Sequence, residues 1–230
     1  MIFHEKLNLK FDVEAMREQV ATIQQTLGDR VGQGSEGVKG MFGGWALQSQ
    51  DGDWRSGFEK GGYFESEGSL VAWETVPPVS DYNKRTDACV GIFADIVDEL
   101  EDKGFYPLRS RITVFDPGQA TMWHTDALPD IYSIRIHIPF MTNADCRFEV
   151  EDVGAVHMPA DGHGHLVDVS TMHRAFNRGD TTRMHFLAQV WPTDYSEKFI
   201  VTESRKDISG FYNVKGRKIF DQVMRDKAKG

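Results

Sequence analysis

The chain has 230 residues and a formal net charge of −9, from 35 acidic and 26 basic side chains. Such a length can bury a sizeable core within one domain. The negative charge repels nucleic-acid phosphates, so a nucleic-acid partner is not expected. No run approaches ~20 apolar residues and the N-terminus has no apolar signal segment, so the sequence predicts a cytoplasmic protein without a membrane span.

The two cysteines, Cys89 and Cys146, lie far apart and do not form a CxxC pair. A disulfide framework is therefore not expected in this chain. We interpret both residues as buried free thiols, which fits a reducing cytosol.

The N-terminal portion, residues 1–104, is expected to combine helices with a glycine-rich stretch. A short strand is expected within residues 1–11. Asp12 is a candidate N-cap for a helix whose apolar residues recur at intervals of three and four, and Gly28 is its expected end. A second helix is expected from about residue 86 to 103, where apolar side chains recur at helical spacing.

Residues 28–69 are dense in glycine and cannot be mostly helical. We interpret them as loops and short strands. One hypothesis makes this stretch a substrate-covering loop with Trp45 or Trp54 as a wall. The alternative, which we favour, is an irregular surface hairpin, because connecting segments usually run over the surface.

From residue 108 onward the spacing of apolar side chains changes to two, which is typical of strands. Strands are expected at residues 111–115, 121–126, 132–140, 146–150, 165–169 and 183–191. Short strands separated by turn signals predict a mainly β fold with flanking helices, in a sandwich or barrel of the jelly-roll kind. Residues 105–192 would form this core, and residues 193–230 a charged extension with a helix or two on the outside.

Histidines gather in one part of the chain, since seven of the eight lie between residues 124 and 185. His124 and Asp126 are two positions apart, so on an extended strand both side chains point to the same face. A third metal ligand must come from another strand, and His173 is the candidate. Two histidines and one carboxylate on one face of an ion form the facial triad of non-haem Fe(II) oxygenases.

These residues resemble a known family. His124, Asp126, His173 and Arg183 are similar to the HxD…H…R pattern of Fe(II)/2-oxoglutarate-dependent oxygenases. Within that class the sequence most resembles the aspartyl/asparaginyl β-hydroxylase-like group, which includes bacterial free-proline cis-hydroxylases. The strand at residues 134–139 and the segment that begins at His173 carry the further similarity, which extends over residues 105–192.

The resemblance implies a double-stranded β-helix, cupin-like, within a single oxygenase domain that covers residues 1–230. It implies that His124, Asp126 and His173 bind Fe(II), and that 2-oxoglutarate is the cosubstrate. A carboxylate at position 126 favours hydroxylation over halogenation, because related halogenating enzymes have a small residue at that place.

The resemblance also assigns cosubstrate contacts. Arg183 would pair with the distal carboxylate of 2-oxoglutarate, because a guanidinium binds a carboxylate through two parallel hydrogen bonds. Arg135 and His137 would be additional cosubstrate-contacting residues. Even without the family, two arginines that point into a barrel predict an anionic ligand, because a buried charge without a partner is costly.

The remaining histidines have simpler interpretations. His4 and His157 are expected to be hydrogen-bonded residues of the core. His163 and His165 form a second HxH pattern, and His165 is a less favoured alternative ligand. His185 is expected to support the site from behind the ligands rather than to bind the metal.

The leading hypothesis is a dioxygenase that hydroxylates a C–H bond of a small-molecule substrate, either a free amino acid or a similar polar metabolite. A second hypothesis keeps the chemistry but makes the substrate an aspartyl or asparaginyl side chain of a protein or peptide. A third, from another class, is a non-catalytic cupin-like module that binds a metal or an anion, because a fold alone does not define an activity.

Overall fold

The computed structural model describes residues 4–32, 42–56, 81–126, 134–169, 172–190 and 200–201. Most of the expected C-terminal extension, and most of the glycine-rich stretch, lie outside these residues. The helices are α1 (Val13–Leu27) and α3 (Ile92–Asp102). The strands are β1 (His4–Lys10), β2 (Val31–Gly32), β3 (Gly43–Ala46), β4 (Gln48–Ser49), β5 (Lys84–Arg85), β6 (Leu108–Phe115), β7 (Ile134–Met141), β8 (Cys146–Val150), β9 (Gly154–Val156), β10 (His163–Asp168), β11 (His173–Asn177), β12 (Arg183–Val190) and β13 (Ile200–Val201).

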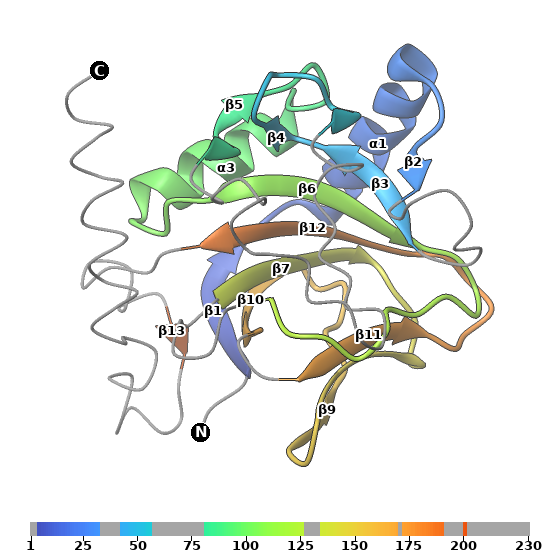
Figure 1. The fold of residues 1–230 in the computed structure, drawn as a ribbon. Helices are drawn as coiled ribbons and strands as arrows, with labels where there is room; N and C mark the ends of the chain where they lie inside the picture. Colours follow the sequence, from blue (N-terminus) through green and yellow to red (C-terminus); the bar gives the residue numbers. More distant parts are fainter. Residues whose placement is uncertain are drawn as a thin grey trace.

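The described strands form a large and a small antiparallel sheet, with a short β4–β5 ribbon beside them (Figure 1). The large sheet has the order β13-β1-β10-β7-β12-β6-β3-β2, so strands distant in the sequence are neighbours. The small sheet has the order β11-β8-β9. Isolated bridges, Ala120 to Phe176 and His124 to His173, add the segment before residue 126 to its edge. Two antiparallel sheets with this crossed connectivity confirm the predicted jelly roll.

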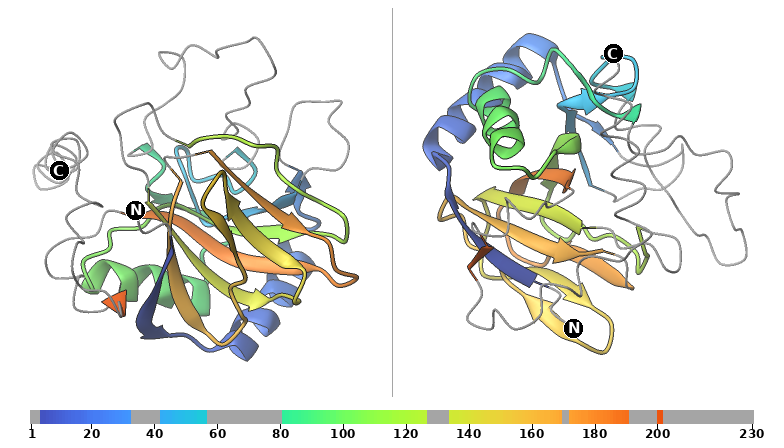
Figure 2. Two further views of the ribbon diagram at one scale, coloured as in Figure 1. Left: turned by 90° about the horizontal axis from the view of Figure 1, so that it is seen from below. Right: turned by 90° about the vertical axis from the view of Figure 1, so that its left-hand side faces the viewer.

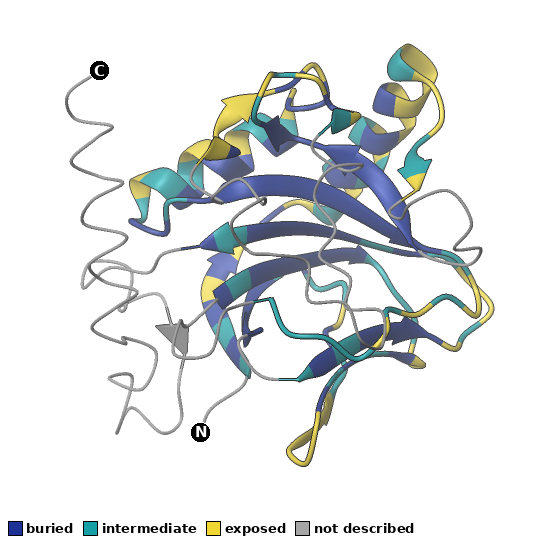
Figure 3. Ribbon diagram, in the orientation of Figure 1, coloured by how far each residue is buried: buried dark blue, intermediate teal, exposed yellow. Residues whose placement is uncertain are grey.

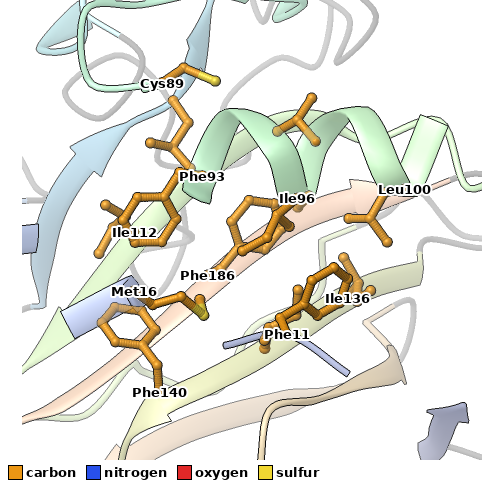
Figure 4. Close-up of a cluster of buried hydrophobic side chains, with 14 of the residues drawn as sticks. Phe11, Met16, Cys89, Phe93, Ile96, Leu100, Ile112, Ile136, Phe140 and Phe186 are labelled. Atoms are coloured by element: carbon orange, nitrogen blue, oxygen red, sulfur yellow. The ribbon is translucent and has the colours of Figure 1, made fainter. Parts of the chain in front are cut away.

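Both helices cover the outer face of the large sheet, as the two views in Figure 2 show. Phe93, Ile96 and Leu100 of α3 are buried against the sheet, while the opposite face of the helix is exposed (Figure 3). Figure 4 shows these side chains above Ile112 of β6 and Phe186 of β12. The main hydrophobic core therefore lies between the helices and the sheet, outside the barrel.

The alternation of side chains in the strands divides them between this core and the barrel interior. In β7, Ile136 and Ile138 join the core under the helices. Arg135 and His137, on the other face, line a cavity between the two sheets. Since the side-chain period of a strand is two, the same rule turns every second residue of β6 and β12 inward. The large sheet thus presents polar side chains to the small one.

Helix α1 has the caps that the sequence predicts. The Asp12 carboxylate accepts hydrogen bonds from the backbone N–H groups of Glu14 and Ala15, at 3.0 and 3.1 Å. Gly28, at φ +87°, follows the last turn. The strands β1, β6, β7, β8, β10 and β12 also lie where strands were expected, to within a few residues at their ends.

Three expectations need correction. Helix α3 begins at Ile92 rather than near residue 86, because Gly91 has a φ of +54° and interrupts the helical backbone. Residues 121–126 are not a continuous strand but an irregular segment tied down by single bridges. Trp45 and Trp54 are almost fully buried in the core and do not line the cavity, so the described part of the glycine-rich stretch is neither a wall over the substrate nor a surface hairpin.

The two cysteines are free and buried, as expected. Within the described part of the chain, neither helix is both long and apolar enough to cross a membrane.

Candidate metal centre

His124, Asp126 and His173 come together at one edge of the small sheet. The backbone N–H of each histidine donates to the carbonyl of the other, at 3.0 and 2.9 Å, so the two residues are direct partners across the strands. The N–H of Asp126 donates to the carbonyl of Val169 at 2.9 Å. These backbone bonds hold both halves of the HxD pattern although the segment is not a regular strand.

The three side chains place their ligand atoms within 4.8 Å of one another. Asp126 Oδ2 lies 3.3 Å from His173 Nε2 and 3.8 Å from His124 Nε2. The Nδ1 of His124 donates to the carbonyl of Met122 at 2.8 Å, which leaves the Nε2 lone pair for a metal. Among the described residues, this is the one group of three potential ligands so arranged.

Electrostatics favour the metal-binding forms of His124 and Asp126. Burial lowers the pKa of His124, so its imidazole is neutral at neutral pH. Burial alone would raise the pKa of the Asp126 carboxyl, but the Arg135 guanidinium and the two histidines hold that pKa well below its usual range. A carboxylate and two imidazole nitrogens with an open side fit Fe(II) in a facial triad.

Arg135 lies beside the ligand carboxylate in this structure. Its Nη1 is 2.8 Å from Asp126 Oδ2, the atom that also faces the two histidines. Such a contact orients the carboxylate, as groups around metal ligands usually do. A direct contact between Arg135 and a cosubstrate stays a prediction.

A cavity between the two sheets opens from the metal centre. Its described lining includes Arg111 and Phe115 from β6, His137 from β7, Phe148 from β8 and Arg183 from β12. Trp123 and Met122, which is half exposed, lie at the same cavity beside His124. The large sheet thus contributes charge, and the small sheet contributes ligands and an aromatic wall.

The buried positive charge of Arg183 requires an anionic partner. Its side chain is 2% exposed, and its guanidinium lies 4.7 Å above the Phe115 ring. Burial lowers the pKa of Arg183 to about 10, so the group still carries its charge at neutral pH. None of the ion pairs found among the described residues involves it, whereas a 2-oxoglutarate carboxylate would supply that partner. The residues present therefore fit the cosubstrate as well as the metal.

Sequence reasoning missed Arg111. This residue of β6 is 3% exposed and lines the cavity, and its backbone pairs with that of Leu187 on β12. Burial, together with the nearby Arg109 and Arg135 guanidiniums, lowers its pKa well below the usual value. The sequence did contain a signal for the burial of Arg111, because Phe115 lies on the same face of this strand and an aromatic residue there indicates that the face is buried.

His4, His157, His165 and His185 are not part of the ligand group. His4 Nε2 is 2.9 Å from His165 Nδ1, and the two rings stack, so His165 contacts another histidine and is not part of the ligand group. His157 Nδ1 donates to the Cys146 carbonyl at 3.0 Å. His185 lies next to Arg183, with 3.1 Å between His185 Nδ1 and the guanidinium.

Comparisons with known proteins identify a family. The family model described as Aspartyl/Asparaginyl beta-hydroxylase matches residues 47–193, which include all six residues predicted for the site. Among curated protein sequences, none matches the chain.

Solved structures that are similar to parts of the chain come from several organisms. A Pseudomonas putida prolyl-4-hydroxylase has 9% identity and a TM-score of 0.46, with 83% of this chain and 92% of that chain covered. A 2OG-Fe(II) oxygenase family oxidoreductase from Burkholderia pseudomallei has 14% identity and a TM-score of 0.46, with coverage of 76% and 78%. A Trichoplax adhaerens prolyl hydroxylase, solved with a hypoxia inducible factor peptide fragment, has 11% identity and a TM-score of 0.46, with coverage of 81% and 80%.

The fold and the site define the class of Fe(II)- and 2-oxoglutarate-dependent hydroxylases. Because the family model covers more than half of the chain, the chain belongs to the aspartyl/asparaginyl β-hydroxylase family. It is accordingly an enzyme that uses Fe(II) and 2-oxoglutarate, and the non-catalytic cupin-like alternative is set aside.

Proposed function

We propose that His124, Asp126 and His173 bind Fe(II), and that Arg183 binds the distal carboxylate of 2-oxoglutarate. In this proposal Arg135 and His137 complete the cosubstrate pocket. Bound iron would supply the activation of dioxygen, and the chain's own groups would orient the carboxylates. The free, buried state of Cys89 and Cys146 fits a reducing, cytoplasmic setting.

We further propose that the enzyme hydroxylates a free amino acid or a similar small polar metabolite that carries a carboxylate. The observation behind this proposal is the excess of positive charge in the cavity. Arg111, Arg135 and Arg183 line it, and Asp126 is the one acid among its described lining residues. Three arginines and one carboxylate leave two positive charges, and Fe(II) would raise this excess to four. 2-Oxoglutarate would neutralise two of the four, and a substrate carboxylate would reduce the remainder.

Arg111 is the residue that we assign to the substrate carboxylate. Arg183 and Arg135 are both assigned to the cosubstrate pocket in this proposal. Arg111 lines the same cavity from the neighbouring strand and is buried, so an anion beside it would be bound strongly.

An aspartyl side chain of a protein or peptide is the second candidate substrate. The family's description favours it, and such a side chain would bring the same carboxylate to the cavity. The two candidates differ in what surrounds the carboxylate, because a free amino acid also carries an ammonium group and no flanking chain.

The first experiment is an anaerobic titration of the purified protein with Fe(II) and then 2-oxoglutarate, followed by the visible metal-to-ligand charge-transfer band. We expect a band that saturates at one equivalent of each. Absence of the band with iron bound would contradict the proposed cosubstrate pocket.

The second experiment supplies oxygen and measures succinate formed with a panel of free amino acids, and with aspartyl- and asparaginyl-containing peptides. Succinate and a product 16 mass units heavier with a free amino acid would support the proposal. The same products with peptides alone would favour the protein-directed alternative.

A further inference from the structure

Behind the proposed cosubstrate pocket lies a buried chain of three polar side chains. His185 Nδ1 is 3.1 Å from Arg183 Nη2 and 3.4 Å from His137 Nδ1. The two imidazole rings are nearly perpendicular, at 86°. His137 and Arg183 line the cavity, whereas His185 lies on the far side of Arg183, in a smaller space between the sheets. His185 therefore touches the pocket residues without facing the cavity itself.

The contact with arginine decides where the protons are. A guanidinium has only donors, so the Nδ1 atom of His185 must accept from Arg183 and its proton must be on Nε2. Because His185 Nδ1 is unprotonated, the facing Nδ1 of His137 must carry a proton, since the lone pairs of two unprotonated nitrogens would repel each other. His137 is then left with a lone pair on Nε2.

A neutral His185 is also what the surroundings require. Burial, followed by the charge of Arg183, lowers the pKa of His185 well below its ordinary value. Burial and the same guanidinium also lower the pKa of His137. An imidazolium at either place would lie beside a buried arginine in a region of low dielectric, where like charges repel strongly.

We propose that His185 is a positioning residue of the cosubstrate pocket, which orients the Arg183 guanidinium through Nδ1 and fixes His137 in the form protonated at Nδ1. The cosubstrate part of this inference rests on the proposed function. The Phe115 ring, 4.7 Å from the guanidinium carbon, supports the face of the group. The hydrogen bond to His185 fixes the rotation of the guanidinium within its own plane. A carboxylate binds through two parallel hydrogen bonds only when both the plane and the rotation of the guanidinium are fixed.

The Nε2 atom of His137 is buried without a hydrogen-bond partner among the described residues. With the proton on Nδ1, this atom accepts a hydrogen bond and does not donate one. His137 Nε2 therefore suits a group that carries a hydrogen, such as a water molecule, and in the proposed pocket such a water would join His137 to an oxygen of 2-oxoglutarate. Direct hydrogen bonds to the carboxylates are then assigned to the arginines.

The test combines proton positions with cosubstrate binding. In full-chain protein loaded with diamagnetic Zn(II), long-range ¹⁵N–¹H spectra of the imidazoles distinguish protonated from unprotonated nitrogens. We expect an unprotonated Nδ1 in His185 and a protonated Nδ1 in His137. A proton on Nδ1 of His185 would overturn the inference, and this measurement needs no variant.

The variants are His185→Leu, which removes the acceptor, and His185→Asn, whose side-chain oxygen can take the place of Nδ1. We expect His185→Leu to weaken 2-oxoglutarate binding roughly 10-fold or more, the effect of losing one hydrogen bond to a charged group, with Fe(II) affinity unchanged. His185→Asn should restore most of the affinity. The control Met184→Leu is on the opposite face of the same strand, in the core, and should bind like the wild type.

The two proposals fail in different ways. Equal cosubstrate affinity in His185→Leu and wild type would overturn the role of His185 alone. No 2-oxoglutarate binding by the wild type, with the proton positions as expected, would overturn the cosubstrate assignment of Arg183 and the role of His185 that depends on it.

Discussion

The buried guanidinium of Arg183 is the group on which cosubstrate binding in this pocket should depend most. We expect Arg183→Met to leave Fe(II) binding intact, because Arg183 contacts His185 and Phe115 and none of the proposed ligands. Binding of 2-oxoglutarate should weaken about 100-fold or more, since a buried charge pair loses one partner. Isothermal titration under anaerobic conditions measures both constants. The control Arg85→Met removes a surface arginine paired with Asp98 and should change neither.

Arg111 allows the substrate and cosubstrate roles to be separated. In the variant Arg111→Gln we expect the KM for the carboxylate-bearing substrate to rise by about 10-fold or more, because a charge-assisted hydrogen bond is lost. The Kd for 2-oxoglutarate should change much less. Steady-state kinetics with each reactant varied in turn distinguish these effects. A rise in the 2-oxoglutarate Kd alone would assign Arg111 to the cosubstrate.

At the scale of the element, helix α1 shows how a local signal becomes a structural contact. We expect Asp12→Ala to lower the free energy of unfolding by about 1 kcal/mol, because the N–H groups of Glu14 and Ala15 lose their acceptor. Asp12→Asn keeps a side-chain oxygen and should lose much less. Urea unfolding followed by circular dichroism measures the difference, and equal losses in both variants would argue against the cap.

Elements with strong local patterns could be predicted from the sequence. The alternation of Ile134, Ile136 and Ile138 with Arg135 and His137 indicated both a strand and its inward face, and the structure places these sets on opposite sides of the large sheet. The HxD spacing likewise required only local geometry. Backbone bonds from His124 and Asp126 to distant strands then reproduced the expected convergence without a regular strand.

Features that depend on distant contacts could not be predicted. Trp45 lies in a glycine-rich stretch, yet its strand pairs with β6 and buries the indole in the core. Arg111 belongs to no short motif, and its location in the cavity follows from the order of β7, β12 and β6 in the sheet. The sequence indicated only that His185 supports the site without binding the metal. Its hydrogen bond to Arg183 could not be predicted, because side-chain hydrogen bonds depend on the positions of atoms in the folded chain.

At the scale of the whole molecule, burial inside the barrel keeps several imidazoles in their neutral form. His165 is 2% exposed and stacks on His4, and burial followed by the charge of His4 lowers its pKa to about 3. Burial lowers the pKa values of His137 and His185 as well. An unfolded chain would protonate all three near their ordinary pKa, so acid should destabilise this fold.

His165 makes the effect measurable. Its folded pKa lies below the unfolded value of 6.5, so between these values the unfolded state binds the extra proton, and stability falls as the pH is lowered. Between pH 7.5 and 5.0, the free energy of unfolding of the wild type should fall by about 2 kcal/mol more than that of His165→Leu, at 1.4 kcal/mol per pH unit below 6.5. Urea unfolding at the two pH values measures this difference. Asn8→Ala, on the exposed part of β1, should follow the wild type, whereas parallel losses in wild type and His165→Leu would show that His165 is not held neutral by the fold.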